Sequence, residues 1–473
     1  MEKYDVIIVG AGPCGYNAAL ELVKLDSKLK ILLIDRGLDI TKRHCPVLEH
    51  KIAKCPNNKS GLKECFPACS ITNGFGGSGA YSDGKFNITT EFGGWLNRYM
   101  DDDTLLNLIN YVDGVNLHYG ADPKITDPSS NEAAREIERK AMSVGLKLLH
   151  SKVRHLGTEQ NIKILENILN DLKKKIDIRF STIVSDVIVE EDCVKGVILD
   201  NGEKINADKV LLAIGREGSR WLTKIFEEHN VPLFQNQVDI GVRVECPNLI
   251  MEEINNNLYE GKMLFRSSTG NTVRTFCSNP GGHVVMENYE GNCVNVNGHS
   301  YADSKLASNN TNFALLVSHE FDETIKEPNY YAMRVSQLAN QIANGGVIIQ
   351  SYGDLLKGRR TTEKRLSECF TTPTLKEAVP SDLSLVLPYK TLQSIIEMIQ
   401  VLDKITPGIA TEHTLLYGVE AKYYSSHPEV TNKLEVKKIK NLYVGGDGAG
   451  ITRGLAQAGA SGVYIARNML EEK

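Results

Sequence analysis

The chain has 473 residues, of which 41% are hydrophobic and 24% charged, and its formal net charge is −5. This length accommodates two or three domains with sizeable cores. The negative balance excludes a basic reservoir for nucleic acid and a polybasic membrane patch. No apolar run reaches the ~18–20 residues of a membrane span. Residues 1–9 lack a signal-peptide pattern, so we expect a cytoplasmic protein.

The first forty residues read as strand, glycine turn, helix, strand and acid. Residues 4–9 are a short apolar run, a glycine-rich turn follows over 10–15, and residues 31–34 are a second apolar run closed by Asp35. This order is the βαβ fingerprint of an adenine dinucleotide site. The sequence therefore predicts a dinucleotide at this turn.

Each residue of the turn has an expected task. Gly10 permits the tight bend, Gly12 lets the main chain approach a pyrophosphate, and Gly15 lets helix and strand pack closely. The helix that begins near Pro13 points unpaired N–H groups and its positive end at the phosphates. Cys14 lies in the same turn, where we expect it to pack rather than react.

The aspartate at the end of the second strand indicates which dinucleotide binds. Asp35, which Arg36 follows, is placed to accept hydrogen bonds from a ribose hydroxyl. A carboxylate at this position disfavours a 2′-phosphate, and hence NADP.

Residues 36–70 contain four of the ten cysteines, namely Cys45, Cys55, Cys65 and Cys69. Three explanations stay open: an Fe–S cluster, a structural zinc, or ordinary thiols. The gaps of nine, nine and three residues match no standard ferredoxin or zinc-finger spacing. Ten cysteines in this length are too sparse for a disulfide scaffold.

Residues 72–87 form a second glycine-rich stretch that includes aromatic residues. Five glycines in so short a span require a main chain that bends sharply or approaches something closely. The alternative is a flexible surface loop that contacts no cofactor. We favour a cofactor-contacting loop, whose candidate residues are Gly76, Gly77, Ser78, Ser82, Asp83 and Lys85.

The middle of the chain alternates between helical and extended patterns. Apolar residues recur at helical spacing over residues 105–149, with interruptions, and a further helix is expected at 162–172. Short β-rich segments at 178–180, 183–189 and 194–199 lead to a hairpin signal at 200–202 and a strand over 205–215. Beyond residue 236 we expect strands at 238–245, 272–277, 283–286 and 293–296, with a hairpin-like turn at 279–282. Helices are expected near 330–342 and 392–402.

These elements resemble the FAD-binding flavoproteins. The short strands look like the β-meander of that fold, in which Val184 matches a position whose backbone faces the adenine, and the next strand ends at Ala213 and Gly215. The stretch 441–450, which runs into a helix over 451–470, is similar to the second FAD motif. The resemblance implies further cofactor contacts at Gly446, Asp447, Gly450 and Ile451. The aspartate would contact the ribityl–pyrophosphate region, and the positive helix end would stabilise a reduced flavin.

Over nearly its whole length the chain resembles the uncharacterised FAD-dependent dehydrogenases. The resemblance implies an α/β fold, with an FAD-binding Rossmann-type domain that carries a β-meander and an inserted α+β substrate or cap domain. We expect residues 1–235 and 431–473 to form the FAD domain and residues 236–430 to form the inserted domain.

A flavin enzyme needs a proton donor or acceptor near the ring. The candidate catalytic residues are Lys85, Cys277, His283 and His299. Each has a bland alternative, because histidines at strand ends are often ordinary hydrogen-bonded residues and a lone strand cysteine is often a small hydrophobe. Arg243 is expected to pair with a carboxylate, although it could line an anion pocket. Tyr81 and Arg274 are further candidates.

The chain has no second dinucleotide fingerprint in its middle and no redox cysteine pair after the first βαβ unit. Electrons would therefore come from the substrate, from a transiently bound NAD(P)H, or from a protein such as ferredoxin. The leading hypothesis is an FAD-dependent oxidoreductase that moves two electrons to or from a small organic substrate. The alternatives are a flavin electron-transfer module, a monooxygenase and an RNA-modifying flavoprotein; the acidic charge disfavours RNA.

Overall fold

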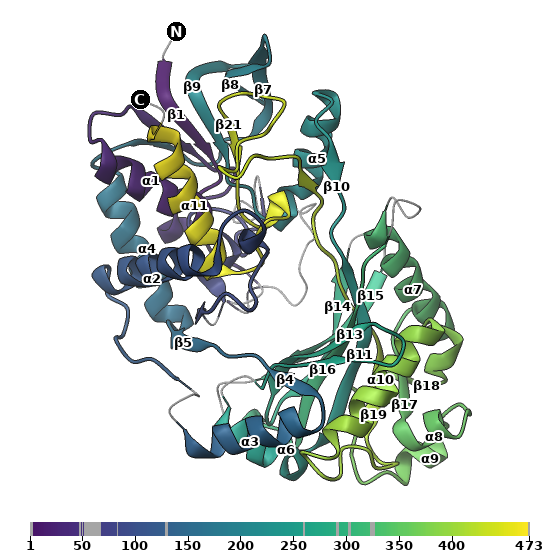
Figure 1. Ribbon diagram of the computed structural model, residues 1–473. Coiled ribbons are helices and arrows are strands. Elements are labelled where there is room, and N and C mark those ends of the chain that lie inside the picture. The colour runs from purple at the N-terminus through teal and green to yellow at the C-terminus, as the bar shows by residue number, and fades with distance from the viewer. Residues whose placement is uncertain are drawn as a thin grey trace. The chain divides into compact units, whose positions relative to one another are not determined.

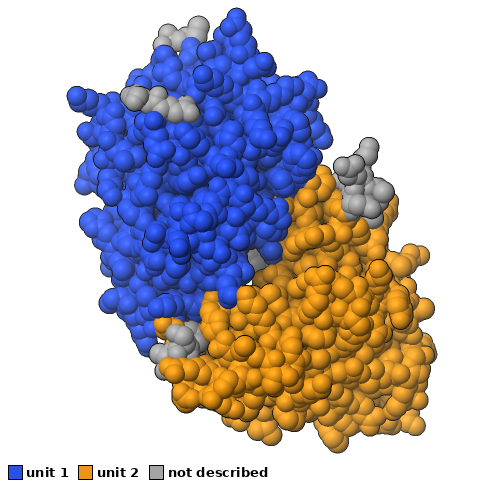
Figure 2. Space-filling view, in the orientation of Figure 1, with its two compact units in different colours: residues 1–126, 151–234, 425–473 blue, residues 127–150, 235–424 orange. Residues whose placement is uncertain are grey.

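The computed structural model describes residues 3–46, 49, 51, 68–82, 84–127, 131–258, 261–289, 293–300, 304–321 and 327–471. The chain divides into two compact units, coloured separately in Figure 2. Unit 1 comprises residues 1–126, 151–234 and 425–473, and unit 2 comprises residues 127–150 and 235–424. Each unit has its own apolar core.

The strands of unit 1 are β1 (Lys3–Val9), β2 (Ile31–Ile34), β3 (Lys85–Ile88), β5 (Lys152–His155), β6 (Asp177–Arg179), β7 (Val184–Glu190), β8 (Cys193–Leu199), β9 (Lys204–Leu212), β10 (Leu233–Phe234), β20 (His427–Pro428) and β21 (Leu442–Val444). Its helices are α1 (Pro13–Leu25), α2 (Asp102–His118), α4 (Thr158–Leu172), α5 (Ser219–Glu228) and α11 (Leu455–Leu470).

The main sheet of unit 1 is a parallel sheet with an antiparallel extension. Strands β6, β2, β1 and β9 are parallel neighbours, and β21 also pairs in parallel with β9. β7, β8 and β9 form the antiparallel meander. β2 and residues 6–9 of β1 are continuous apolar runs because a parallel sheet is buried on both faces. This architecture confirms the predicted α/β fold with its meander.

Two helices far apart in the sequence lie side by side in unit 1. Figure 1 shows α11, at the yellow end of the chain, beside α1. A Cβ built on Gly462 would lie 2.0 Å from the Cys14 carbonyl oxygen. The glycine therefore permits a contact that any other residue would block.

The strands of unit 2 are β4 (Leu146–Leu148), β11 (Val238–Pro247), β12 (Met263–Arg266), β13 (Thr272–Asn279), β14 (His283–Tyr289), β15 (Cys293–His299), β16 (Asn310–His319), β17 (Ile348–Ser351), β18 (Val379–Pro380) and β19 (Leu415–Lys422). Its helices are α3 (Glu132–Ser143), α6 (Asn248–Asn257), α7 (Pro328–Ile342), α8 (Tyr352–Leu356), α9 (Glu363–Ser367) and α10 (Tyr389–Leu402).

The large sheet of unit 2 is mostly antiparallel, with the strand order β18-β17-β19-β11-β16-β13-β12-β4. One face is apolar and forms the core of the unit with side chains from α7 and α10. The opposite face carries polar and charged side chains. β14 and β15 form a separate two-stranded sheet.

Three local expectations differ from the structure. Residues 146–148 form β4 rather than the end of a helix, because Gly145 turns the chain at φ +82 and β4 then pairs with β12. That pairing places residues 127–150 in unit 2, whereas the expected boundary counted them with the FAD domain. The turn at 279–282 joins β13 to β14, but these strands belong to different sheets and form no hairpin.

No helix in the described ranges combines the length and apolarity needed to cross a membrane.

Candidate functional site

The glycine turn after β1 is held tightly against the end of β9. Gly10 has φ +106, and a Cβ there would lie 2.3 Å from the Ala213 carbonyl oxygen. A Cβ on Gly15 would lie 1.8 Å from the Gly10 carbonyl oxygen. Gly12 precedes the helix without a side-chain cap, and Pro13 occupies the first turn. The first N–H groups of α1 therefore lack a side-chain partner from their cap residue.

The second glycine-rich loop meets this turn. A Cβ on Gly77 would lie 3.2 Å from the Gly12 Cα. Gly76 donates its N–H to the Ala11 carbonyl oxygen at 2.8 Å. Two segments more than sixty residues apart thus present bare main chain at one place. This arrangement leaves no side chain between the loop, the turn and a ligand.

Asp35 ties three main-chain segments together. Its Oδ2 accepts a hydrogen bond from the Ala11 N–H at 2.8 Å, and its Oδ1 accepts from Gly37 at 2.7 Å and Gly74 at 3.0 Å. A carboxylate has about four acceptor sites. One site therefore remains for a ribose hydroxyl, so the side chain is shared between structure and the predicted contact.

The residues around Asp35 include the other predicted contacts at the ribose end. Thr182 donates its N–H to the Asp35 carbonyl oxygen at 3.1 Å, which brings the start of β7 and the buried Val184 to this end. Arg36 donates from Nε to Asn73 at 2.7 Å and forms an ion pair with Glu217 at 2.9 Å. Its charge is therefore already matched by a carboxylate.

Arg43 was not among the residues predicted from the sequence. Its buried guanidinium donates to four main-chain carbonyl oxygens of the glycine-rich loop, at 2.6–2.9 Å, which belong to Ser70, Ile71, Phe75 and Gly77. Tyr81 donates its hydroxyl to the Arg43 carbonyl oxygen at 2.5 Å. The arginine thus fixes the path of the loop that reaches Gly12. No local pattern marks it, because its partners are main-chain atoms.

The C-terminal glycine segment closes on the same strand end. Gly448 donates its N–H to the Ile214 carbonyl oxygen at 2.8 Å, and a Cβ there would lie 2.4 Å from the Gly215 carbonyl oxygen. Burial raises the pKa of the Asp447 carboxyl, although a hydrogen bond from Thr452 at 2.6 Å opposes this shift. A buried carboxyl at this point needs hydrogen-bond donors.

Residues 93–95 form hydrogen bonds with the residues that precede the N-terminus of α11. The main-chain N–H of Trp95 donates to the Ile451 carbonyl oxygen at 2.9 Å, and the main-chain N–H of Arg453 donates to the Gly93 carbonyl oxygen at 2.9 Å. The guanidinium groups of Arg453 and Arg98 lie 5.0 and 5.4 Å from the centre of the Trp95 ring. The glycine pair at 93–94 was the only sequence signal for this contact.

Two parts of the chain match known families. Residues 4–101 match the pyridine nucleotide-disulphide oxidoreductase family, and residues 237–423 match the family described as FAD-dependent protein, C-terminal domain-like. The chain is an FAD-dependent oxidoreductase. An uncharacterized protein of Clostridium beijerinckii is 26% identical over 500 residues, which span 99% of this chain and 81% of that protein.

Solved structures align with the whole chain at low similarity. L-proline dehydrogenase from P. horikoshii is 11% identical with a TM-score of 0.38, and the alignment covers 100% of this chain and 94% of that one. The E. coli quinol fumarate reductase subunit is 13% identical with a TM-score of 0.40, covering 100% and 71%. TM-scores this low carry no information about the reaction of this chain.

The residues of unit 1 fit FAD. Gly12 and Gly77 form a cradle that a Cβ would fill, which is what a pyrophosphate requires of the main chain. Asp35 keeps an acceptor site at the ribose end. Asp447 lies between β21 and α11. Gly12, Asp35 and Asp447 each follow a strand of the parallel sheet (β1, β2 and β21), so these three residues lie at the same edge of that sheet.

The cofactor candidates after Gly77 lie within or beside this loop. Ser78 is exposed on the short 3₁₀ turn Gly77–Tyr81, and Ser82 donates its hydroxyl to the Gly79 carbonyl oxygen at 2.8 Å. Lys85 begins β3 and pairs with His155 across to β5. Asp83 lies outside the described residues. Cys14 packs against Ser461, and burial raises the pKa of its thiol to about 12, as expected for a packing role.

The other catalytic candidates lie in unit 2. His283 and His299 are cross-strand partners in the β14–β15 pair, and the His283 ring lies 2.9 Å from the Leu306 carbonyl oxygen. Cys277 has φ 46 at the irregularity between β13 and β16. Its carbonyl oxygen accepts from Arg243 at 3.0 Å. Non-glycine residues in this conformation are uncommon and concentrate at functional sites.

The cysteine cluster is only partly described. Cys55 and Cys65 lie outside the described residues, and the described Cys45 and Cys69 are not in a disulfide. Within the ranges that the structure describes, no group of three His, Cys, Asp or Glu residues could hold a metal. The cluster hypothesis stays a prediction.

Proposed function

We propose that unit 1 binds FAD at the sheet edge where Gly12, Asp35 and Asp447 lie and that the protein moves two electrons between the flavin and a small organic substrate. The observation that carries the proposal is the close approach of Gly12 and Gly77, with a Cβ on Gly77 only 3.2 Å from the Gly12 Cα. Two bare main-chain segments at a helix N-terminus form an anion-binding site. This feature favours a pyrophosphate at this point.

Each end of the proposed site has a separate task. The N–H groups at the start of α1 would hold the pyrophosphate, together with Pro13, Cys14 and Gly15, while Asp35 would accept from the ribose. Val184, Ala213 and Gly215 would contact the cofactor through their main chain. At the other end, Asp447 would hold the ribityl region and Gly450 and Ile451 would lie near the ring. FAD, when bound, supplies the two-electron chemistry.

The proton chemistry would come from the chain's own side chains. Lys85 of unit 1 and Cys277, His283 and His299 of unit 2 are the proposed acid–base groups. Unit 2 would form the substrate domain, since the match to the FAD-dependent C-terminal family lies within it. We propose a cytoplasmic location, with NAD(P)H or a ferredoxin as the external electron partner. A ferredoxin would be favoured if Cys45, Cys55, Cys65 and Cys69 hold a cluster.

The test starts with anaerobically purified protein. We expect flavin absorption bands, FAD rather than FMN after denaturation, and bleaching of the bands by NADH, NADPH or reduced ferredoxin. The reductant that bleaches fastest identifies the electron partner, and oxygen consumption would identify a monooxygenase. A colourless protein that fails to bind added FAD would contradict the proposal. Gly12→Val should abolish FAD binding, and Gly114→Val is the control, because nothing lies within 4 Å of a Cβ at Gly114 and its φ is not positive.

A further inference from the structure

The large sheet of unit 2 has a polar face opposite its apolar core. In β11, Val238, Ile240 and Val242 point into the apolar core. Because strand side chains alternate, Asp239 and Arg243 lie on the opposite face. Both are buried. A buried polar face requires partners for its charges.

Besides Arg243, five basic side chains lie on this face, on β4, β12, β13, β19 and the residue before β12. Lys147 pairs with Leu264, and Leu264 pairs with Arg274, so all three share a face. Residues two positions away on a strand point to the same side. The members, which we call the cationic face, are Lys147, Lys262, Arg266, Arg274 and Lys422.

Three of these cations surround one aromatic ring. The Arg274 Cζ atom lies 5.1 Å from the centre of the Phe276 ring, and the Nζ atoms of Lys262 and Lys422 each lie 5.8 Å away. The ring is half-buried. Like charges gathered at one ring repel each other unless an anion lies between them.

The carboxylates on this face are each shared among several donors. Glu420 accepts two hydrogen bonds from Arg243, each at 2.8 Å, so Lys422 at 3.1 Å is an additional cation. Asp239 accepts from Ser318 at 2.8 Å and from Tyr424 as well as from Arg274. The next carboxylate on the face, Glu245, accepts from Tyr417, Thr374 and Asn310. Positive charge therefore predominates around Phe276.

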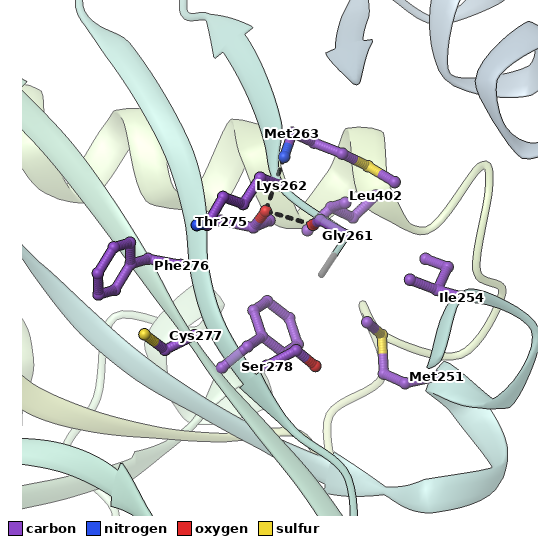
Figure 3. Close-up of a pocket in the computed structure, with 11 residues that line it drawn as sticks. Met251, Ile254, Gly261, Lys262, Met263, Thr275, Phe276, Cys277, Ser278 and Leu402 are labelled. Atoms are coloured by element: carbon purple, nitrogen blue, oxygen red, sulfur yellow. Dashed lines mark hydrogen bonds between the residues drawn. The ribbon is translucent and has the colours of Figure 1, made fainter. Parts of the chain in front are cut away.

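The Arg274 side chain has hydrogen-bonding capacity that the described residues do not use. The Nε atom of Arg274 is buried and has no hydrogen-bond partner among the described residues. Buried N–H groups are almost always partnered. The nearby cavity, lined by Lys262 and Phe276 among others, is only about 20 Å³ and has room for one water (Figure 3). An acceptor larger than water would lie on the sheet face and not in this cavity.

We propose that the cationic face binds an oxyanion, a carboxylate or a phosphate, of a small molecule whose flat apolar part rests on Phe276. This inference rests on the proposed function, because the molecule would be an organic acid that serves as substrate or a nicotinamide dinucleotide that supplies electrons. Arg274 and Lys422 hold the anion, and Lys262 completes the cationic ring. Carboxylates and phosphates are the natural partners of such donors.

Calorimetric titration of the FAD-loaded protein with benzoate, inorganic phosphate and NADPH tests the site. The key variants are Lys262→Met, Lys422→Met and their combination, and the control is Arg135→Met, whose exposed side chain lies on α3 of the same unit. Lys422→Met should fold, because Arg243 still holds Glu420. Each single variant should raise Kd about fivefold and the double variant about twenty-five-fold, with binding weakened by salt.

The variant Phe276→Ala distinguishes an organic acid from a nicotinamide dinucleotide as the ligand. Loss of benzoate affinity with phosphate affinity retained indicates a flat carboxylic acid, whereas tight NADPH binding that phosphate displaces indicates a dinucleotide phosphate. Either result supports the site. Absence of binding by all three probes at roughly 10 mM, or equal affinity in the double variant and the control, overturns it. Flavin content is measured on the same samples, so loss of FAD without loss of anion binding contradicts only the proposed function.

Discussion

Gly77 lies against Gly12, such that a Cβ on Gly77 would be 3.2 Å from the Gly12 Cα. The two glycines come from segments that also share hydrogen bonds to Asp35, from Ala11 and Gly74. This contact makes the glycine-rich loop part of the dinucleotide turn.

Gly77→Ala should weaken FAD binding about tenfold, because its φ of +60 and the contact with Gly12 both oppose a side chain. Fluorescence titration of the apoprotein with FAD measures the effect. Gly202→Ala is the control, since it shares a positive φ of +85 but nothing lies within 4 Å of its Cβ. Equal FAD affinities in the two variants would contradict the assignment.

Arg43→Met should lower the free energy of unfolding of unit 1 by about 3 kcal/mol, because it leaves buried carbonyl oxygens without donors. Arg43→Lys should lose less, since an ammonium keeps three donors. Urea unfolding followed by flavin release measures both. The half-buried Arg179, whose ion pair with Glu203 is partly open to solvent, serves as the comparison, and Arg179→Met should change stability by less than about 0.5 kcal/mol. If Arg43→Met proves as stable as Arg179→Met, Arg43 does not fix the path of the glycine-rich loop.

Asp447→Asn should stabilise the apoprotein at pH 7 while weakening flavin retention. Burial raises the folded-state pKa of this carboxyl, so its favourable contribution is present below the unfolded pKa of about 3.8 and is lost as pH rises through the folded value. The gain from Asn should therefore shrink as pH falls toward 4. Thermal melts of apoprotein at several pH values measure it. The exposed Asp208→Asn variant should show no such trend.

Asp447→Ala should reduce flavin content more than Cys45→Ser or Cys69→Ser. The aspartate lies in the second glycine segment, whereas the two described cysteines lie in the loop that Arg43 joins to the glycine-rich segment. Absorbance per mole of protein gives the comparison. Iron analysis of the anaerobic wild-type protein belongs with it, since a pure flavin spectrum without iron would end the cluster hypothesis.

Cys14 should resist alkylation in the folded protein at pH 8, because burial raises the pKa of its thiol to about 12 and the thiolate is the reactive form. Peptide mapping after N-ethylmaleimide treatment measures labelling at each cysteine. The half-buried Cys45 provides the reference and should label faster. Rapid labelling of Cys14 would show that the turn opens.

The sequence alone determined the dinucleotide turn, the meander and the C-terminal glycine segment. These features are local, because an apolar run, a glycine turn and an acid occupy fixed positions within about forty residues. The same reasoning located Asp35 and Asp447. It also anticipated that Cys14 packs.

Only the tertiary structure revealed the role of Arg43 and the cationic face. The partners of Arg43 are main-chain carbonyl groups 27–34 residues away, and main-chain atoms leave no residue-specific signal. The cationic face joins Lys147 to Lys422 through the register of antiparallel strands. Register between strands distant in sequence is set by how the sheet assembles, so a single chain read in order cannot place these charges together.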